Sequence, residues 1–293
     1  MNIYLAIIII IILIMLFRDP NEKFDNLINN TIEGFSEKLT ENFNSNEVEI
    51  YLIHMAKNID RLQNFEQSYF NSDMSFKKFN IFPAVIGKDL NLINYVSPKA
   101  YKQILMSEKT GTRMHHYDLT RGAVGCYLSH LSIYKNIIEK NMKYGIIFED
   151  DAIIANDFYK RLLYGLNVVP KNWDIFLLGV ICLKCDVGKE YINIKRFWGT
   201  HGYIVNNQSA KKLLEYLDKP LSKQIDADMS LLIKKGIINV YAINPVIVVQ
   251  DNKFGSDIQM SVTDSSVAFN EEFKQGVLMD FYAKNRIVKV GYE

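Results

Sequence analysis

The apolar positions of this chain follow two different periods. From residue 48 onward, short apolar runs bounded by polar or turn-forming residues alternate with longer segments whose apolar residues recur every three or four positions. The short runs are typical of buried strands, and the longer segments are typical of helices with one apolar face. Strands that alternate with helices favour an α/β fold in which helices flank a mostly parallel sheet.

The same pattern predicts the individual elements. Strands are expected at residues 48–53, 79–85, 146–148, 173–178, 199–205 and 240–249, the last of them broken at Pro245. Helices are expected at residues 58–70, in part of 90–106, within 119–138, and at 157–166, 208–217 and 224–234. Their N-terminal capping residues would be Asn58, Thr120, and either Asn206 or Asn207, because these side chains accept hydrogen bonds from a helix's first amides.

The N-terminal segment has another pattern. Residues 3–17 contain no charged or strongly polar side chain, and Arg18, Asp19 and Pro20 end the run. Counted from Met1, the apolar stretch has 17 residues, at the short end of the roughly 17–25 residues that cross a bilayer. A cleaved signal peptide fits poorly, because the segment lacks a basic start and a small-residue cleavage site. We therefore predict a single-pass membrane protein with an anchor at 1–18, a stem at 19–46 and a globular domain at 47–293. The sequence does not decide on which side of the membrane the globular domain lies. A buried or interfacial helix is the alternative for the apolar run.

Composition narrows the function classes. The chain has 293 residues, is 48% hydrophobic and carries a formal net charge of +1, so no basic excess suggests a nucleic-acid partner. Its three cysteines exclude a disulfide-dense scaffold. Cys182 and Cys185 form one CxxC pair, but a structural zinc site needs four ligands. Ordinary thiols are therefore expected at these positions.

The strand predicted at 146–148 ends in three consecutive carboxylates, Glu149, Asp150 and Asp151. Unpaired charges are too costly to bury, so the strand must emerge at a cleft or surface, and ligands bind at such strand ends in open α/β sheets. Carboxylates suit Mn²⁺ or Mg²⁺, which can hold a diphosphate. We expect Asp151 to be the metal ligand, with Asp150 as second choice if the strand has already ended. The alternative is that these acids complement a helix dipole.

Four groups of residues share the motifs of one enzyme family. They are residues 50–61 (IYLIHMAKNIDR), 119–130 (LTRGAVGCYLSH), 147–151 (IFEDD), and a C-terminal group made of 199–203 (GTHGY), 225–226 (ID), 250 (Q) and 256–258 (SDI). In this order they resemble glycosyltransferase family 25, the lipooligosaccharide and collagen galactosyltransferase-like family. The sequence departs from the family pattern at His54, Met55 and Ala123, where Asn, Leu and Glu are usual, so the details of the donor pocket stay open.

The resemblance implies a GT-A-type nucleotide-sugar-binding fold, a UDP-sugar donor and inversion at the anomeric carbon. It also implies Mn²⁺ or Mg²⁺ as cofactor, transfer of a hexose such as galactose or glucose, and a glycan or protein hydroxyl as acceptor. Inversion needs a base beside that hydroxyl, and Asp226 and Asp228, at a predicted helix start, are the catalytic candidates. Their alternative role is to complement that helix's dipole.

A further set of residues is predicted to contact the nucleotide-sugar or its metal. The set consists of Arg61, Gly125, Ser129, His130, Glu149 and Asp150. For His130 the alternative is a hydrogen-bonded core histidine, and for Arg61 it is a solvated helix charge.

Two other functions compete with sugar transfer. An inactive relative would bind a sugar or nucleotide without transfer, but the intact acidic triplet argues against it. A phosphohydrolase would use further His or Asp ligands for a two-metal centre, and the five scattered histidines supply no obvious set.

Overall fold

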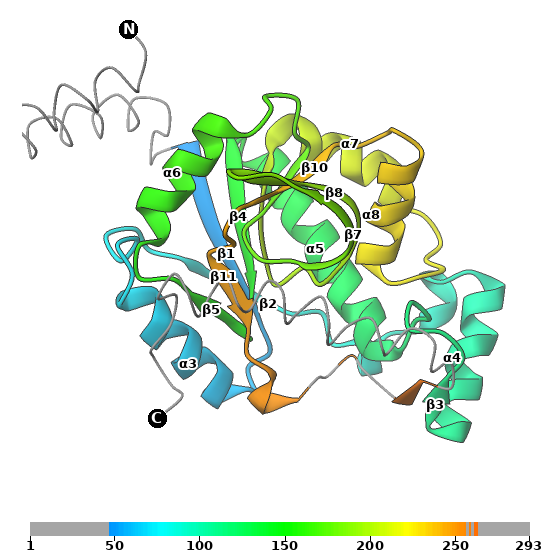
Figure 1. Cartoon of the computed structure of the whole chain (residues 1–293). Coiled ribbons are helices and arrows are strands. Elements are labelled where there is room, and N and C mark those ends of the chain that lie inside the picture. Colours follow the sequence, from blue (N-terminus) through cyan, green and yellow to red (C-terminus); the bar gives the residue numbers. More distant parts are fainter. Residues whose placement is uncertain (1–46, 256–257, 259–260, 263–293) are drawn as a thin grey trace, which may run out of the picture. The chain divides into compact units, whose positions relative to one another are not determined.

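An eight-stranded mixed sheet forms the core of the fold in the computed structural model, which describes residues 47–255, 258 and 261–262 (Figure 1). The strands, in spatial order, are β2 (Asn80–Pro83), β1 (Val48–His54), β4 (Tyr144–Glu149), β9 (Gly202–Asn206), β6 (Ile175–Leu177), β10 (Val240–Ile243), β8 (Tyr191–Trp198) and β7 (Ile181–Val187).

The prediction of a mostly parallel sheet is wrong. Parallel pairing joins β2 to β1, β1 to β4 and β6 to β10, whereas β4–β9, β9–β6, β10–β8 and β8–β7 are antiparallel. A parallel return needs a crossover of a dozen or more residues, usually a helix. The chain passes from β6 through the β7–β8 hairpin to β9 with no helix between them, so β9 returns antiparallel to β6.

The helices lie on both faces of the sheet, as expected for an α/β protein (Figure 1). The helices are α3 (Ile59–Phe70), α4 (Pro98–Thr110), α5 (Arg121–Glu139), α6 (Phe158–Val168), α7 (Asn207–Leu217) and α8 (Ile225–Lys234), of which α4 lies beside the sheet against residues 92–94 and 112–113. The side chain of Thr120 accepts a hydrogen bond from Ala123 N, and that of Asn206 accepts one from Ser209 N, so both predicted caps are confirmed. Asn58 precedes α3 but makes no side-chain capping bond.

Short elements complete the described part of the chain. They are the 3₁₀ turns η2 (Gly87–Asp89), η3 (Leu92–Asn94) and η4 (Asn252–Phe254), the pair β5 (Ala152–Ile154) with β11 (Val248–Gln250), and the pair β3 (Thr112–Arg113) with β12 (Ser261–Val262). The break predicted at Pro245 is confirmed, because β10 ends before it and β11 begins after it.

Alternation along β4 sends neighbouring side chains to opposite layers. Phe148 packs against Phe65 of α3 and Phe158 of α6 on one face. Gly145 lies against Ile137 of α5 on the other face, where a Cβ atom would collide with that side chain. Because successive side chains of a strand alternate, Glu149 is directed to the α5 side.

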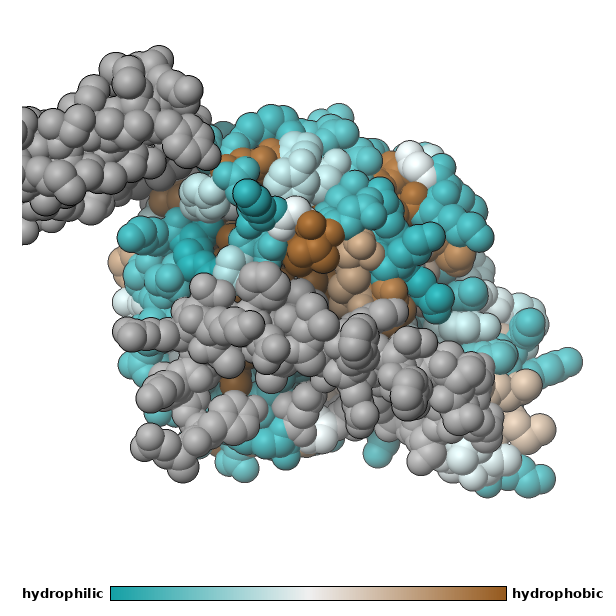
Figure 2. Space-filling view, in the orientation of Figure 1, coloured by the Kyte–Doolittle hydropathy of each residue, from teal (hydrophilic) through white to brown (hydrophobic). Residues whose placement is uncertain are grey.

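Hydrophobic burial is concentrated between these layers. Ile50, Leu52, Ile146, Ile147 and Phe148 have no exposed surface. On the face seen in Figure 2, the described residues are mostly hydrophilic, with hydrophobic residues in small groups between them. Such isolated apolar groups are ordinary at protein surfaces.

The expectation of ordinary thiols at the CxxC pair is wrong. Cys182 and Cys185 form a disulfide within β7, where the pairing with β8 is irregular. The register shifts between Cys182 and Cys185 bring the two side chains together although they belong to one strand. Cys126 is a free cysteine.

The prediction of a single-pass membrane protein also needs correction. Among the residues that the structure describes, no helix combines the length and the apolar character needed to cross a bilayer. The predicted anchor at 1–18 and stem at 19–46 lie outside those residues.

Candidate active site

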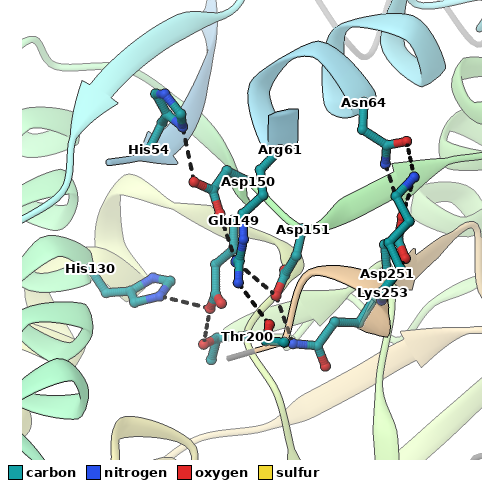
Figure 3. A network of polar contacts seen from close by, with 12 residues as sticks. His54, Arg61, Asn64, His130, Glu149, Asp150, Asp151, Thr200, Asp251 and Lys253 are labelled. Carbon is teal, nitrogen blue, oxygen red and sulfur yellow. Dashed lines mark hydrogen bonds and ion pairs between the residues drawn. The ribbon is translucent and has the colours of Figure 1, made fainter. Parts of the chain in front are cut away.

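The three acids at the end of β4 point to different partners (Figure 3). Glu149 Oε1 accepts a hydrogen bond from Thr200 Oγ1 at 2.6 Å and lies 3.2 Å from His130 Nε2. Asp150 lies 2.9 Å from His54 Nδ1 through one oxygen and accepts from Arg61 Nη1 at 3.1 Å through the other. Each carboxylate is therefore held by a separate part of the fold.

Asp151 differs from its neighbours in having one unsatisfied oxygen. Its Oδ2 accepts from Gln250 Nε2 at 2.9 Å and lies 3.6 Å from Arg61 Nη1, whereas its buried Oδ1 has no hydrogen-bond partner. A buried polar atom without a partner is costly and needs an explanation, such as an ion. Both oxygens of Asp150 are engaged, so this geometry favours Asp151 as the ligand of a divalent cation.

Burial and charge separate the pKa values of these acids. Burial, together with the nearby charge of Glu149, raises the pKa of Asp151 from 3.8 to about 7. Burial also acts to raise the pKa of Glu149, but hydrogen bonds and the charge of His130 outweigh it and lower that pKa. A bound cation would shift Asp151 back to its ionised form, because an opposite charge favours the carboxylate.

A cavity of about 390 Å³ opens at these acids and also contains basic side chains. The acids are Glu149, Asp150 and Asp151, and the bases are Lys57, Arg61, Lys88 and Arg121. The lining therefore offers carboxylates for a cation together with cations for an anion, and both are needed to hold a metal–diphosphate complex.

A second, smaller cavity of about 70 Å³ adjoins the first. Both are lined by Cys126, Glu149, Gln250 and Ile258, so Glu149 stands where they meet. The smaller cavity also contains Trp198, whose ring stacks on His116 with centroids 4.0 Å apart.

Asp226 lines the smaller cavity. Its carboxylate accepts hydrogen bonds from Gly199 N at 3.0 Å and from Ala227 N at 2.7 Å. Burial raises the pKa of Asp226, and those hydrogen bonds act against the rise. A base with a raised pKa is better matched to proton transfer near neutral pH.

Asp228 is not brought into this site. It lines neither cavity and accepts a hydrogen bond from Tyr127 Oη of α5 at 3.1 Å. Its position two residues after Asp226 turns it about 200° around the helix, because each residue advances about 100°. Only one of the two predicted catalytic acids therefore faces a cavity.

Gly125 and Ser129 support the wall of the larger cavity from behind. Ser129 Oγ accepts from Val85 N at 2.8 Å and donates to Gly125 O at 2.8 Å. A side chain at Gly125 would collide with the carbonyl of Val85. Val85 and Gly87 line the cavity, whereas Gly125 and Ser129 do not. Both residues thus act on the site through the segment they position.

His130 is fully buried and has contacts on both ring nitrogens. Nδ1 lies 2.7 Å from Tyr203 Oη, and Nε2 faces Glu149. The histidine therefore reaches the site through Glu149 and lines neither cavity.

Sequence reasoning missed several residues that surround the acids. Lys57, Lys88 and Arg121 line the larger cavity, but nothing in their local sequence separates them from surface cations. His54 had a usable signal, because it ends β1, the parallel neighbour of β4, and the carboxyl ends of parallel strands meet at one edge. Cys126 lines both cavities beside Glu149.

Comparison with known proteins agrees with the sequence motifs. Residues 47–187 match the family model described as glycosyltransferase family 25 (LPS biosynthesis protein). This region of the chain is similar to glycosyltransferase family 25. The family resemblance predicted from the motifs is confirmed, and the family is one of glycosyltransferases.

Two relatives show how far the similarity extends. Procollagen galactosyltransferase 1-B of Xenopus laevis is 30% identical over 191 residues, which cover 61% of this chain and 30% of that protein. The lipooligosaccharide biosynthesis protein lex-1 of Haemophilus influenzae is 30% identical over 154 residues, which cover 45% of this chain and 50% of that protein. The chain thus spans between about a third and a half of the length of these two relatives.

Structural similarity is more distant. The glycosyltransferase GlyE of Streptococcus pneumoniae TIGR4 aligns with a TM-score of 0.38 and 10% identity, covering 84% of this chain and 66% of that one. A likeness at this level carries no argument about function.

Proposed function

We propose that this family 25 chain is a metal-dependent glycosyltransferase with a GT-A-type donor site. It transfers a hexose, galactose or glucose, from a UDP-sugar to a hydroxyl of a glycan or protein with inversion. The observation that carries the proposal is the joint presence of three acids and four basic side chains in one cavity.

The charges of the larger cavity suit a nucleotide diphosphate. Lys57, Arg61, Lys88 and Arg121 supply positive charge for the phosphates. Asp151, with its buried unpaired Oδ1, fits as the ligand of Mn²⁺ or Mg²⁺, the hard cations that carboxylates select. When bound, such an ion would neutralise charge on the departing diphosphate. The cavity's volume of about 390 Å³ lies in the range usual for small-molecule sites.

The smaller cavity suits the acceptor. Asp226 is its buried carboxylate and would take the proton from the attacking hydroxyl. Trp198 offers an aromatic surface of the kind that packs against the apolar face of a sugar. Glu149, at the boundary of both cavities, lies where the anomeric carbon would meet the acceptor. With the donor in the larger cavity and the acceptor in the smaller one, the two substrates would meet at Glu149, as inversion by direct attack of the acceptor hydroxyl requires.

Arg61 and Asp150 would act together. Arg61 donates to Asp150 and also to Gly255 O at 2.7 Å, so it ties the end of β4 to the chain that follows β11. Asp150 thereby contributes by holding the guanidinium toward the diphosphate. This arrangement assigns Asp150 a positioning role beside the metal ligand Asp151.

An inactive sugar- or nucleotide-binding relative is the alternative. The presence of Glu149, Asp151 and Asp226 within the two adjoining cavities favours the enzyme, because loss of these acids is the simplest route to an inactive site.

The deciding experiment measures UDP release from a panel of UDP-sugars, with and without Mn²⁺ and with candidate glycan and protein acceptors. We expect release that needs the metal and rises with the correct acceptor, and that is lost in Asp151→Asn. Asp157→Asn is the matched control, since Asp157 is an exposed residue before α6. If the protein binds a UDP-sugar but transfers its sugar to no acceptor, the inactive relative is favoured. If it releases phosphate from unrelated phosphate esters when a metal is present, a hydrolase is favoured.

A further inference from the structure

We propose that Cys126, His130 and Glu149 form a zinc site at the boundary of the two cavities, and that filling it inhibits sugar transfer. The two α5 residues are four positions apart, so they lie on one face of the helix, and Glu149 ends the strand packed against that face. One ligand atom from each residue lies within 4.8 Å of the others.

The geometry is close to that of a tetrahedral zinc centre. Zinc bonds of about 2.0–2.3 Å to nitrogen, oxygen and sulfur place neighbouring ligand atoms about 3.3–3.7 Å apart. His130 Nε2 and Glu149 Oε1 are already 3.2 Å apart. The sulfur lies within 4.8 Å of both, so an approach of about an ångström would complete three corners.

The chemistry of the ligands separates this site from the one at Asp151. Thiolate, imidazole and carboxylate together are a typical zinc set, whereas Mn²⁺ and Mg²⁺ favour oxygen ligands alone. The end of β4 would thus carry two cation sites, one at Glu149 that prefers zinc and one at Asp151 that prefers Mn²⁺ or Mg²⁺. Binding at the new site requires Cys126 as thiolate, so the thiol proton passes to solvent.

Tyrosines behind His130 can set its tautomer for metal binding. Tyr203 Oη lies 2.7 Å from His130 Nδ1 and 2.7 Å from Tyr134 Oη, and either tyrosine can donate to the other. If Nδ1 carries the proton and donates it to Tyr203, the lone pair of Nε2 is available for a cation. Such a hydrogen bond to the second nitrogen is the usual support of a metal-binding histidine.

The two cavities determine how a zinc ion reaches the site and how it would affect sugar transfer. Cys126 and Glu149 line both of them, so an ion can enter from either and keep its fourth position for water. An ion at this point would take Glu149 away from Thr200 and stand between donor and acceptor. The inhibitory consequence rests on the proposed function, whereas the binding site does not.

The test begins with metal binding to the full chain, without any sugar substrate. Cobalt replaces zinc in such sites and reports thiolate ligation by a charge-transfer absorption in the near ultraviolet. We expect a thiolate band that saturates at one Co²⁺ per chain, whatever binds at Asp151, and that disappears when Zn²⁺ displaces the cobalt. Cys126→Ser should abolish the band, and Tyr203→Phe should weaken Zn²⁺ binding by about 10–100-fold. The Cys182→Ser, Cys185→Ser double variant is the matched control and should keep the band.

The second part adds transfer assays at saturating Mn²⁺. Zn²⁺ should inhibit the wild type and should inhibit Cys126→Ser much less, each compared with its own zinc-free rate. Absence of the thiolate band in the wild type would contradict the proposed zinc site, and so would its retention in Cys126→Ser. The wild-type spectrum alone tests the site if the variant does not fold. Zinc binding without any transfer activity would leave the site standing and reject the proposed function instead. Equal inhibition of both proteins would reject the inhibitory role.

Discussion

Glu149, Asp150 and Asp151 are consecutive in the chain, but their surroundings give them separate roles. The hydrogen bonds and charge of His130 keep Glu149 ionised, Asp150 is occupied by His54 and Arg61, and Asp151 keeps one buried oxygen without a partner. At the residue scale, Asp151 is therefore distinguished from Glu149 and Asp150 by its oxygen without a partner, which leaves it free to bind a cation.

The raised pKa of Asp151 predicts a pH-dependent stability in metal-free buffer. Its folded-state pKa, about 7, exceeds the ordinary value of 3.8. The folded state therefore binds the proton more tightly than the unfolded chain, and this contribution to stability is lost as pH rises from about 4 through about 7. We expect the free energy of unfolding of the wild type to fall relative to that of Asp151→Asn over this range.

Urea unfolding of both proteins at several pH values, with a chelator present, measures this difference. Adding Mn²⁺ should reduce the fall in the wild type alone, because the ion stabilises the ionised carboxylate. Parallel stability curves for the two chelated proteins would contradict the buried, shifted carboxyl.

Asp226 and Asp228 can be distinguished by paired substitutions. If Asp226 is the base, Asp226→Asn should lower single-turnover transfer by roughly 10²–10⁴-fold with little change in UDP-sugar affinity. Asp228→Asn keeps an oxygen that can accept from Tyr127 and should leave transfer within a few-fold of wild type. Calorimetry of donor binding and rapid-quench kinetics supply the two measurements.

Either of two results would change this assignment. A large loss of donor affinity in Asp226→Asn would show that this acid holds the donor sugar. A loss of rate in Asp228→Asn equal to that in Asp226→Asn would return Asp228 to the catalytic set.

At the scale of elements, periodicity predicted most helices and the strands of the centre. The helix near 119–138 and the strand at 48–53 were found because their apolar positions repeat clearly and most of them are buried in the core, although Leu128 and Ile138 are half-buried. The β7–β8 hairpin was missed. Residues 183–190, in β7 and the turn after it, are largely polar and exposed at an edge of the sheet, so they lack the apolar signal on which the prediction relied. In β8 the buried Ile192, Ile194 and Phe197 did carry that signal, and it was overlooked.

The roles of Gly125 and Ser129 show where sequence reasoning about the site ends. Their motif predicted a contact with the nucleotide-sugar, but both residues lie behind the cavity wall, and no local pattern reveals that they hold the segment at Val85 and Gly87. That contact joins residues 44 positions apart in the chain. Positioning through such contacts depends on the tertiary fold and leaves no periodic trace.

This supporting role predicts a difference between two serines of α5. Ser129→Ala removes the acceptor of Val85 N, and an unpaired amide costs about 1–3 kcal/mol. We expect it to weaken donor binding several-fold and to lower stability. Ser132→Ala is the matched control, because Ser132 makes the same kind of bond, to Leu128 O, without touching residues 85–87. Equal donor affinities in the two variants would show that the segment needs no such support.

At the scale of the whole described domain, the larger cavity is built by segments far apart in the chain. It takes residues from 53–61, 84–88, 121–126, 149–151 and 250–258. The parallel pairing of β1 with β4 brings the first and fourth segments together, and Gln250 and Arg61 fasten the last one to them. A mixed sheet serves this purpose as well as a parallel one, because the strands that end at the acids, β1 and β4, are themselves parallel.

This construction predicts which segments of the chain donor binding should protect from amide hydrogen exchange. UDP with Mn²⁺ should slow amide hydrogen exchange in the sequence-distant segments 84–88, 121–126 and 250–255 together, because each forms part of one cavity wall. Peptides from residues 183–194 of the β7–β8 hairpin line neither cavity and serve as the internal control. Asp151→Asn should lose the metal-dependent part of the protection in all three segments at once. Protection confined to one segment, or equal protection in the hairpin, would show that the nucleotide binds elsewhere.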